Sequence, residues 1–529
     1  MIFTKGSSSR FMNKMSRILL FVLLSCLSHE VCTQPYGLVP ETGRLLSTGN
    51  AYDKAEMRNF WNSGRNATGL RQDTVTVSYA GVGGEYETGG FRDYWEAESS
   101  WSAGAMARTI THLDRISMSG TFSFENFSGE GMCGSMSARP GYYPVDVLEF
   151  TPGGKTRQTY SFSGGISADA GSHWRIGGKI EYTGMNYTKR KDLRHTNYLL
   201  DMTVVPSAMY HDGDFAIGLA GIFSKNSESI DAEELGISSS AYYAFLDKGL
   251  MYGAYESWEG NGVHLSESGI DGFPMRELLY GGALQMQWKS LYAEIEYLYG
   301  EGKAGEKQTE WFRFSGHGIS ARLGYSFHSS VAEHYLKFAA DWKRQTNDET
   351  VVGKVTEDGV TVTEIYGSNR LYERRLLRLN PEYVLVSPSW SVKAGTYVVS
   401  LARLVSPMYP YVYSRHDIIS GAYLSGDVSV GKFDVLAGLY FRMGNAKEES
   451  GGDDAQIDAG EPPYRLEEWY ALQGEYMTAP RVSAKAGVRY NFLKGLYAEA
   501  TVIYTKGFNL SYITGSDRLA AAICLGYVF

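Results

Sequence analysis

From residue 74 to the C-terminus, apolar and polar residues alternate along most of the chain. In the segment 318–327, apolar residues recur at every second position, with polar or small residues between them. A period of two places the two sets on opposite faces of a β-strand, whereas a helix would need a period of about 3.6. The pattern therefore predicts an all-β chain. The apolar set in this segment is Ile319, Ala321, Leu323, Tyr325 and Phe327, and segments 336–343 and 482–491 repeat the pattern.

The alternating segments are long, and the connections between them are short and long in turn. Many segments run for roughly 11–15 residues, whereas a tilted membrane strand needs about 9–11. Short periplasmic turns and long extracellular loops are typical of a transmembrane antiparallel up-and-down β-barrel, which must close because lipid cannot satisfy an open sheet edge. The expected turns are 170–172, 211–213, 289–290, 328–330, 387–389 and 493–495, and the expected long loops are 128–156, 226–275, 347–360 and 445–463.

The number of strands depends on one ambiguous segment. Single-chain bacterial barrels usually have an even number of strands, and the alternation predicts about 16–18 here. Counted as a membrane strand, the segment 464–478 brings the total to about nineteen; as part of an extracellular hairpin it leaves about eighteen. A soluble β-sandwich or propeller is the alternative to a membrane barrel.

The last segment carries the most specific pattern. Ile523, Leu525, Tyr527 and Phe529 fall on one face, and Phe529 is the last residue. A terminal aromatic residue preceded by apolar residues at every second position resembles the signal read by the outer-membrane barrel assembly machinery. The resemblance implies that this machinery is a partner and that the protein lies in the cell outer membrane.

Residues 1–33 are typical of a secretory signal peptide. Lys14 and Arg17 precede a short apolar run, Ile18–Leu27. A membrane-spanning helix needs about 20 apolar residues, so this run is too short to be one. We expect cleavage near Thr33, and the alternative is a lipoprotein signal with Cys26 as the modified residue.

Residues 34–73 show no strand alternation and precede the barrel, which we place at 74–529. Asn50 is a suitable N-cap for a short amphipathic helix over Asn50–Arg65. Such a segment lies in the periplasm or folds into the lumen as a plug. The apolar members of the helix are Tyr52, Ala55, Met57, Phe60 and Trp61.

Composition and charge narrow the possible partners. The 39 Tyr and 10 Trp suit membrane interfaces, and the 61 Gly suit turns and curved strands. The net charge is −9, and residues 1–33 contribute +3, so the processed chain carries −12. This charge argues against nucleic acid as a partner. Of 4 cysteines, two lie in the signal segment, and Cys133 and Cys524 are predicted to be isolated thiols.

The histidines show no catalytic or metal-binding spacing. Of the 10, one lies in the signal segment, and none of the remaining nine belongs to a His-Glu-x-x-His motif or to a recognisable Ser-His-acid set. We therefore expect no enzymatic activity, no metal and no cofactor. An enzyme at the rim is a third hypothesis, because His328 and His334 flank one predicted turn and His211 lies in another.

Charged residues within the strand segments lie on the polar face. Arg or Lys facing lipid would cost roughly 2–4 kcal/mol at the midplane, so these side chains are predicted to face the lumen. Both signs occur, which fits a wet pathway for polar solutes or a filled interior in which charges pair across strands. The predicted lumen-facing residues are Glu294, Glu296, Arg322, Lys337, Asp341, Lys343, Lys485, Arg489 and Glu499.

Two long loops have distinctive compositions. The acidic loop 445–463 lacks the ligand spacing of a calcium site and is predicted to be solvated and mobile. The loop 226–275 is rich in aromatic residues, which suit a glycan, a partner protein or a constriction folded into the mouth. The acidic residues are Glu448, Glu449, Asp453, Asp454, Asp458 and Glu461, and the aromatic residues are Tyr242, Tyr243, Phe245, Tyr252, Tyr255 and Trp258.

Two resemblances add expectations. Arg65–Leu70 resembles the Asn-Pro-Ala-Gly-Leu element in the hatch of long-chain fatty-acid transporters, with Ala67 replacing the proline and Thr68 as an extra residue. A polar turn leading into the first strand is the alternative. Through the Thr33-Gln34 exit, the segment 61–70 and the closing run 492–529, most of the chain is similar to large outer-membrane barrels of Bacteroidota of unknown function. Members of that group resemble accessory barrels beside energy-coupled uptake receptors.

These observations favour a transport-type barrel, either a porin-like channel or an accessory subunit of an outer-membrane nutrient uptake system. The alternative is a closed structural barrel that presents its extracellular loops to a partner. The expected partners are outer-membrane lipid and lipopolysaccharide, the assembly machinery, and a TonB-dependent receptor or a surface lipoprotein.

Overall fold

The computed structural model describes residues 59–191, 193–233, 244–251, 254–257, 270–305, 310–357, 360–406, 412–451 and 466–529. The predicted signal peptide and the predicted helix N-terminus at Asn50 lie outside these residues. Among the helices that are described, none is long and apolar enough to cross a membrane.

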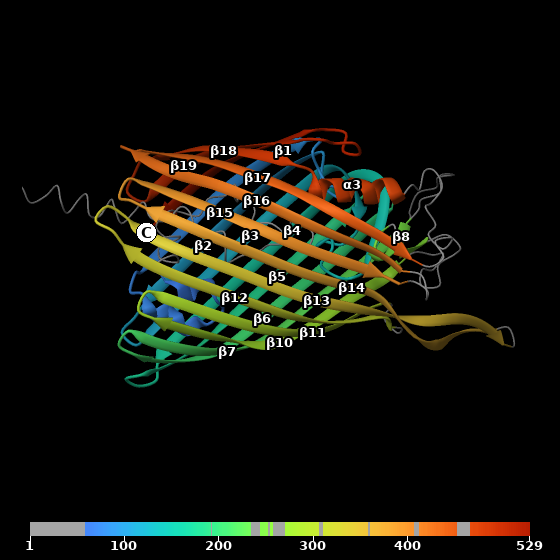
Figure 1. Ribbon diagram of the computed structural model, residues 1–529, viewed down its shortest axis with the longest axis horizontal. Coiled ribbons are helices and arrows are strands. Elements are labelled where there is room, and N and C mark those ends of the chain that lie inside the picture. The colour runs from blue at the N-terminus through green and yellow to red at the C-terminus, as the bar shows by residue number, and fades with distance from the viewer. Residues whose placement is uncertain are drawn as a thin grey trace, which may run out of the picture.

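The strands form one closed antiparallel barrel (Figure 1). β1 pairs with β2 on one side and with β20 on the other, which joins the two ends of the sheet. β7 pairs directly with β10, so β8 and β9 are outside the wall, which has 18 strands in the described part of the chain. The wall strands are β1 Val77–Gly89, β2 Ser99–His112, β3 Ile116–Ser135, β4 Asp146–Asp169, β5 Trp174–Lys189, β6 Arg194–Asp212, β7 Phe215–Glu233, β10 Ile270–Trp288, β11 Leu291–Gly305, β12 Glu310–His328, β13 Glu333–Glu357, β14 Val360–Val386, β15 Trp390–Val405, β16 Val412–Val430, β17 Phe433–Gly451, β18 Arg481–Asn491, β19 Leu496–Gly507 and β20 Asp517–Val528.

Side chains alternate between the outside of the wall and the lumen. On β11, Ile295 is 53% exposed on the outside, whereas the side chains of Glu294 and Glu296 on either side of it are buried. Three of the predicted assembly-signal residues lie on β20 and the fourth directly follows it, and all are exposed on the outer face: Ile523, Leu525, Tyr527 and Phe529. Phe529 also exchanges backbone hydrogen bonds with Ser78 of β1, so the last residue helps to close the wall.

All six predicted short connections are turns at the end of the barrel where β1 begins and β20 ends. At the other end, the strands run further than predicted. The predicted loop 347–360 is wrong, because β13 and β14 continue through it as a hairpin that projects beyond its neighbours (Figure 1). Its Val- and Thr-rich sequence has a high β-propensity, which explains the extension. The β7–β10 connection likewise spans only the residues between Glu233 and Ile270.

Segment 464–478 is neither a membrane strand nor part of a hairpin. Its described residues form the helix α3, Leu466–Thr478. Leu466, Tyr470, Gln473 and Met477 are buried at the three- and four-residue spacing of one helix face. Glu467 and Glu468 in the first turn suit the positive end of the helix dipole.

Candidate functional site

A β-hairpin crosses the loop-side mouth of the barrel. β8 (Ala244–Leu250) and β9 (Ala254–Ser257) pair with each other. β8 also pairs with residues Asp146–Glu149 of β4, and it contacts β14 and β15. Since β4 and β15 stand on opposite sides of the 18-strand ring, the hairpin bridges the lumen from wall to wall.

The start of β4 leaves the wall to meet this hairpin. β4 pairs with β5 only from Lys155 onward, and the β3–β4 register shifts twice, between Gly129 and Met132 and between Met132 and Gly134. Gly131 and Gly134 have φ of 68° and 76°, a left-handed conformation that glycine adopts without strain. The two bulges turn residues 146–153 inward.

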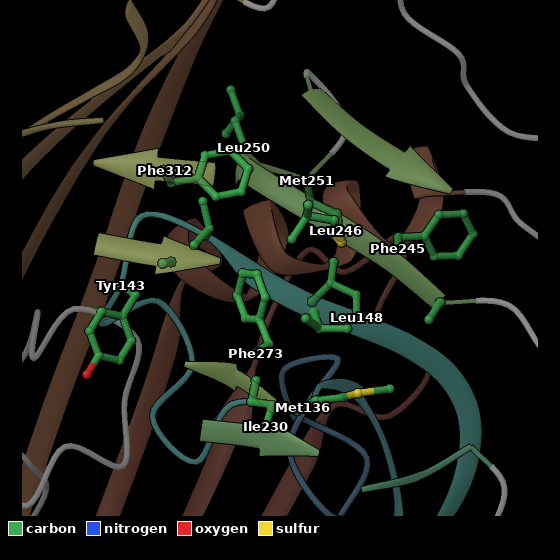
Figure 2. Packing of buried hydrophobic residues seen from close by; sticks show 14 of the residues in the cluster. Met136, Tyr143, Leu148, Ile230, Phe245, Leu246, Leu250, Met251, Phe273 and Phe312 are labelled. Carbon is green, nitrogen blue, oxygen red and sulfur yellow. The ribbon is translucent and has the colours of Figure 1, made fainter. Parts of the chain in front are cut away.

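A continuous hydrophobic cluster, which we call the outer seal, fills the mouth around this hairpin (Figure 2). Wall residues such as Phe273 of β10 and Phe312 of β12 pack against Leu148 of β4 and Leu246 of β8, and all four are 0% exposed. Leu466 and Tyr470 of α3 join the cluster from β16 and β17, where the helix packs. Other members are Met136, Tyr143, Ile230, Phe245, Leu250, Met251, Trp311, Tyr372, Val405 and Tyr413.

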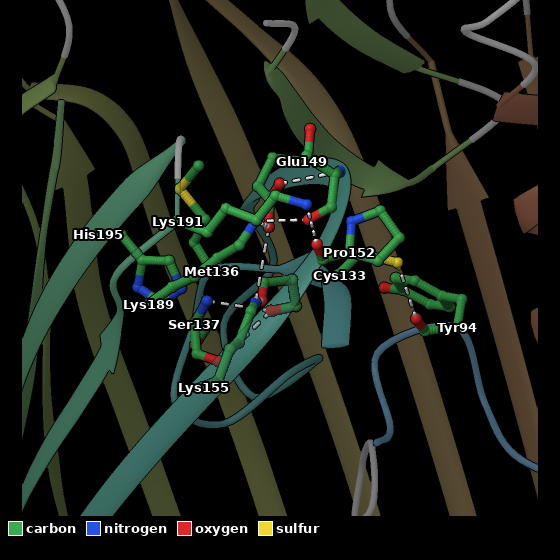
Figure 3. Close-up of polar contacts among 12 residues, drawn as sticks. Tyr94, Cys133, Met136, Ser137, Glu149, Pro152, Lys155, Lys189, Lys191 and His195 are labelled. Carbon is green, nitrogen blue, oxygen red and sulfur yellow. Dashed lines mark hydrogen bonds and ion pairs between the residues drawn. The ribbon is translucent and has the colours of Figure 1, made fainter. Parts of the chain in front are cut away.

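Beside the seal lies a buried polar cluster (Figure 3). The Lys189 ammonium donates to Glu149 Oε1 and to the Thr151 carbonyl, both at 2.6 Å. Lys155 donates to the Ser135 carbonyl at 2.7 Å and lies 3.9 Å from Glu149. The side chains of both lysines and of Glu149 are 0% exposed. One carboxylate thus holds two buried ammonium groups and ties the inward segment of β4 to β5.

The β3–β4 loop is fixed to the wall at several strands. The Glu228 carboxylate of β7 accepts hydrogen bonds from Ser137 Oγ at 3.0 Å and from the Ala138 amide at 2.6 Å. Tyr142 donates to Glu277 of β10 at 2.7 Å, and Arg374 of β14 donates to the Gly141 carbonyl at 2.6 Å. Burial raises the pKa of Tyr142, so its hydroxyl stays protonated as a donor.

The N-terminal segment 59–73, which we call the inner plug, occupies the turn-side mouth. It contains the 3₁₀-helices η3 (Phe60–Ser63) and η4 (Ala67–Gln72), capped by Asn59 and Asn66. The Phe60 ring stacks on Tyr292 of β11 at 6.0 Å, and Trp61 Nε1 donates to Gln287 of β10 at 2.5 Å. Phe60 and Trp61 belong to a second cluster, with residues from β1, β2, β6, β7, β11, β13, β14 and β19.

Inward-facing glycines of the wall make room for the inner plug. A Cβ at Gly218 would lie 2.6 Å from Trp61, and one at Gly324 would lie 2.8 Å from Phe60. A Cβ at Gly177 would lie 3.2 Å from Thr68. Real Cβ contacts are essentially never under 3.0 Å, so the wall is shaped to this segment.

Two ion pairs also attach the inner plug to strands of the wall. Arg71 pairs with Asp169 of β4 at 2.6 Å, and Arg65 pairs with Glu296 of β11 at 3.5 Å. The inner plug is therefore held to separate parts of the wall by aromatic packing, by close packing against glycines and by ion pairs.

The predicted lumen-facing residues lie on the inward rows. Glu294 accepts from Arg322 at 2.6 Å, and Arg489 pairs with Glu499 at 2.6 Å, so the structure joins two pairs within the set. The others pair elsewhere or lie apart. Glu296 pairs with Arg65 of the inner plug, and Asp341 pairs with Arg378 of β14 at 2.7 Å. The three lysines differ in exposure: Lys337 and Lys485 are half-buried, whereas Lys343 is exposed on its inward row.

Sequence reasoning missed further inward pairs on the neighbouring strands. Arg403 and Arg415 both pair with Asp417, at 3.1 and 2.8 Å, and Lys393 pairs with Glu382 at 2.8 Å. The same alternation would have found these residues. The Glu149 and Glu228 clusters lie where a strand leaves the wall or meets a loop, and no spacing marks them.

A cavity of about 540 Å³ opens between α3, β16, β17 and the β19–β20 loop. Arg415, Glu448, Tyr470 and Tyr512 are among its lining residues. Glu475 of α3 closes one side, because it accepts hydrogen bonds from the backbone amides of Tyr512 and Ile513 at 2.9 and 2.8 Å.

The remaining predicted features are only partly within the described residues. Phe245 and Tyr255 pack in or against the outer seal, whereas Tyr242, Tyr243, Tyr252 and Trp258 lie outside them. Glu448 and Glu449 lie within β17, which continues to Gly451, whereas Asp453, Asp454, Asp458 and Glu461 lie outside the described residues. Cys133 and Cys524 are both buried, and neither forms a disulfide within the described residues. Within the described part of the chain, no group of acidic, His and Cys side chains could hold a metal ion.

Comparison with known proteins finds one family. The model of a family of unknown function, DUF6850, matches residues 67–529. No curated protein matches the chain.

Several solved outer-membrane barrels are distantly similar in structure. The siderophore receptor PirA from Acinetobacter baumannii is 9% identical, with 86% of this chain and 81% of PirA covered and a TM-score of 0.39. The outer-membrane transporter YddB from Escherichia coli is 7% identical, with coverage of 86% and 81% and a TM-score of 0.40. The RagAB peptide transporter is 8% identical, with coverage of 81% and 72% and a TM-score of 0.40. These likenesses are too distant to transfer a function.

Proposed function

The chain belongs to DUF6850, a family of unknown function, and we propose that this member is a closed accessory barrel of the outer membrane. In this proposal it serves an uptake or surface assembly through its extracellular face, and it is neither an open pore nor an enzyme. The membrane location is supported by the band of exposed apolar side chains around the wall, whereas the buried charged side chains of the strands lie on the inward rows. Origin in Bacteroidota and likeness of Arg65–Leu70 to a fatty-acid transporter hatch remain predictions from the sequence.

The observation that carries the proposal is the outer seal. Its core side chains are fully buried, and they come from opposite sides of the wall and from the hairpin between them. Exposing even five such side chains costs roughly 10 kcal/mol, at about 2 kcal/mol each. That cost lowers the open population by about seven factors of ten. Spontaneous opening is therefore too rare to support diffusion of nutrients, and a porin-like role is disfavoured.

The ion pairs in the lumen also support a closed barrel. Glu294–Arg322, Arg489–Glu499 and Asp341–Arg378 satisfy each other across neighbouring strands. A conducting pathway needs charges that meet the solute, whereas paired charges brace the wall. The mixed signs predicted from the sequence are thus better explained by a filled interior.

The projecting β13–β14 hairpin is where we propose that a surface lipoprotein or a TonB-dependent receptor docks. Within the described residues, the pairing of β12 with β13 extends as far as Glu349, and the pairing of β15 with β14 begins at Tyr372. Beyond these residues the two strands pair with each other, so their outer edges carry backbone groups that a partner strand can use. Ile365 and Tyr366 are 63% and 62% exposed there.

Single-channel recording in planar bilayers tests the proposal. We expect the intact protein to show no steady conductance, and a variant lacking both residues 59–73 and residues 244–257 to show open channels. Deleting either segment alone is the matched control, because one closure then remains. Steady conductance of the intact protein would overturn the proposal in favour of a porin-like channel.

A further inference from the structure

Two arginines stand on the outside of the wall at the loop-side border of the apolar belt. On β13, Trp342 is the last apolar residue of the belt, and Arg344 is the next residue on the same face, 43% exposed. On β14 the corresponding residues are Leu377 and Arg375, whose side chain is 62% exposed. Each guanidinium therefore lies one outward position beyond the hydrophobic surface, where lipid headgroups begin.

The sheet register sets these two arginines directly opposite each other. Like charges in such a pair destabilise a sheet unless an anion lies between them. Glu373 accepts hydrogen bonds from the Nε atoms of Arg344 at 3.0 Å and of Arg375 at 2.5 Å. One carboxylate against two guanidinium groups leaves an excess positive charge, so the pair has capacity for a second anion.

A second group of cations lies nearer the rim on the strands next to this pair, and its register row meets Asp348 of β13, which pairs with Arg370 of β14. Arg276 of β10 lies directly opposite Lys303 of β11, which in turn lies opposite Arg313 of β12. Arg276 is exposed one outward position beyond Leu278, the last apolar residue of the belt on its strand. Lys303 and Arg313 share the single carboxylate of Glu310. Glu301 of β11 is also exposed on this face. Across the described residues of β10–β14 six cations therefore stand against four carboxylates, which leaves a net positive charge along the border of the belt; the cations are Arg276, Lys303, Arg313, Arg344, Arg370 and Arg375, and the carboxylates are Glu301, Glu310, Asp348 and Glu373.

We infer that this basic band binds the phosphate groups of a phosphorylated glycolipid of the outer leaflet. Guanidinium groups present paired N–H donors that match phosphate oxygens. The apolar belt directly below, with Trp342 and Leu377, would hold the acyl chains of the same molecule. A free phosphate ion would use only the first of these two surfaces, so their adjacency favours a lipid. The inference rests on the outer-membrane location proposed above.

Retention of lipid A, measured by native mass spectrometry after detergent exchange, tests the inference. The probes are lipid A and the same lipid without its phosphates. We expect the wild-type protein to retain lipid A in preference to the dephosphorylated lipid, even in the presence of excess inorganic phosphate. The variant Arg344→Gln/Arg375→Gln should bind lipid A at least about tenfold more weakly, because each cation near an anionic lipid surface contributes about a factor of five.

The control variant is Lys432→Gln/Lys494→Gln, which removes the same charge at exposed turns of the other end. It should bind lipid A as the wild type does, and migration of boiled and unboiled samples on a gel checks that each barrel is folded. Equal binding by the arginine variant and the wild type overturns the inference, as does equal binding of both lipids or displacement by phosphate. Such results would leave the closed-barrel proposal standing, because bilayer conductance does not depend on them.

Discussion

The Glu149 carboxylate and the Lys189 ammonium form a 2.6 Å ion pair in which neither side chain is exposed. The pair links the inward segment of β4 to the wall strand β5, next to the outer seal. Lys155 lies 3.9 Å from the same carboxylate, so Glu149 compensates two buried positive charges. Breaking a buried pair by removing one partner leaves an uncompensated charge in the protein.

Glu149→Gln should therefore lower the free energy of unfolding by roughly 3–5 kcal/mol. Urea titration of the folded barrel in detergent micelles measures the change. Glu125→Gln is the matched control, because Glu125 pairs with Arg157 at 2.9 Å but is 38% exposed. A partly exposed pair contributes about 1 kcal/mol at most. Equal effects of the two substitutions would contradict the role assigned to Glu149.

The outer seal should weaken as the pH rises. Burial in β8 raises the pKa of Asp247 to about 7, against about 3.9 in an unfolded chain. Between these values the folded state binds one proton more than the unfolded state, so stability is highest at low pH and falls as the pH approaches 7. Asp247→Asn should flatten this part of the curve of unfolding free energy against pH from 4 to 8. An unchanged slope in the variant would contradict the assignment.

The inner plug depends on the glycines that face it. Gly218→Val should displace residues 59–73, since the new Cβ would lie 2.6 Å from both Trp61 and Asn66. We expect trypsin to cleave at Arg65 and Arg71 many times faster than in the wild type. Gly178→Val is the control, because its Cβ meets only the Val205 carbonyl, at 3.8 Å. Unchanged cleavage in the Gly218 variant would mean that the inner plug is not held as described.

The projecting hairpin should be dispensable for folding. Replacing residues 351–366 with a two-residue Asn-Gly turn removes strands that pair with each other beyond β12 and β15. An isolated two-stranded hairpin contributes little stability by itself. The unfolding temperature of the barrel should therefore change by no more than about 2 °C. A large loss would show that the hairpin supports the wall, contrary to its proposed role as a docking arm.

The wall of the barrel could be predicted from the sequence because its signal is local. The apolar Ile295 between the charged Glu294 and Glu296 is enough to indicate which side chains face outward. The same period of two recurs in the segments 318–327, 336–343 and 482–491. The segment 464–478 is predicted as a strand or as part of a hairpin because its aromatic residues suit both, whereas the spacing of its buried residues Leu466, Tyr470 and Met477 is helical.

The closures of the lumen could not be predicted in the same way. Leu148 and Leu246 meet only because β4 bends at two bulges and β8 crosses the mouth. Neither the bend of β4 nor the crossing of β8 produces a periodic pattern in the sequence, and both depend on contacts between distant parts of the chain. The inner plug was one of two options for residues 34–73, and the glycines that receive it are common in strands for other reasons.

The most direct test of the closed lumen is the reactivity of a cysteine placed between the two closures. Lys343 lies on the inward row of β13. On one side of it in this row is Tyr335, which packs in the same cluster as Phe60 and Trp61 of the inner plug. On the other side is Asn347, whose register partner Tyr372 belongs to the outer seal. The two cysteine variants are made in a chain whose native cysteines are replaced by serine and are treated with a charged, membrane-impermeant thiol reagent. Lys343→Cys should react at least about a hundredfold more slowly than Ser450→Cys at the exposed rim, because the closed mouths separate position 343 from the reagent. Comparable rates at the two positions, in a protein that is folded and inserted, would contradict the closed barrel.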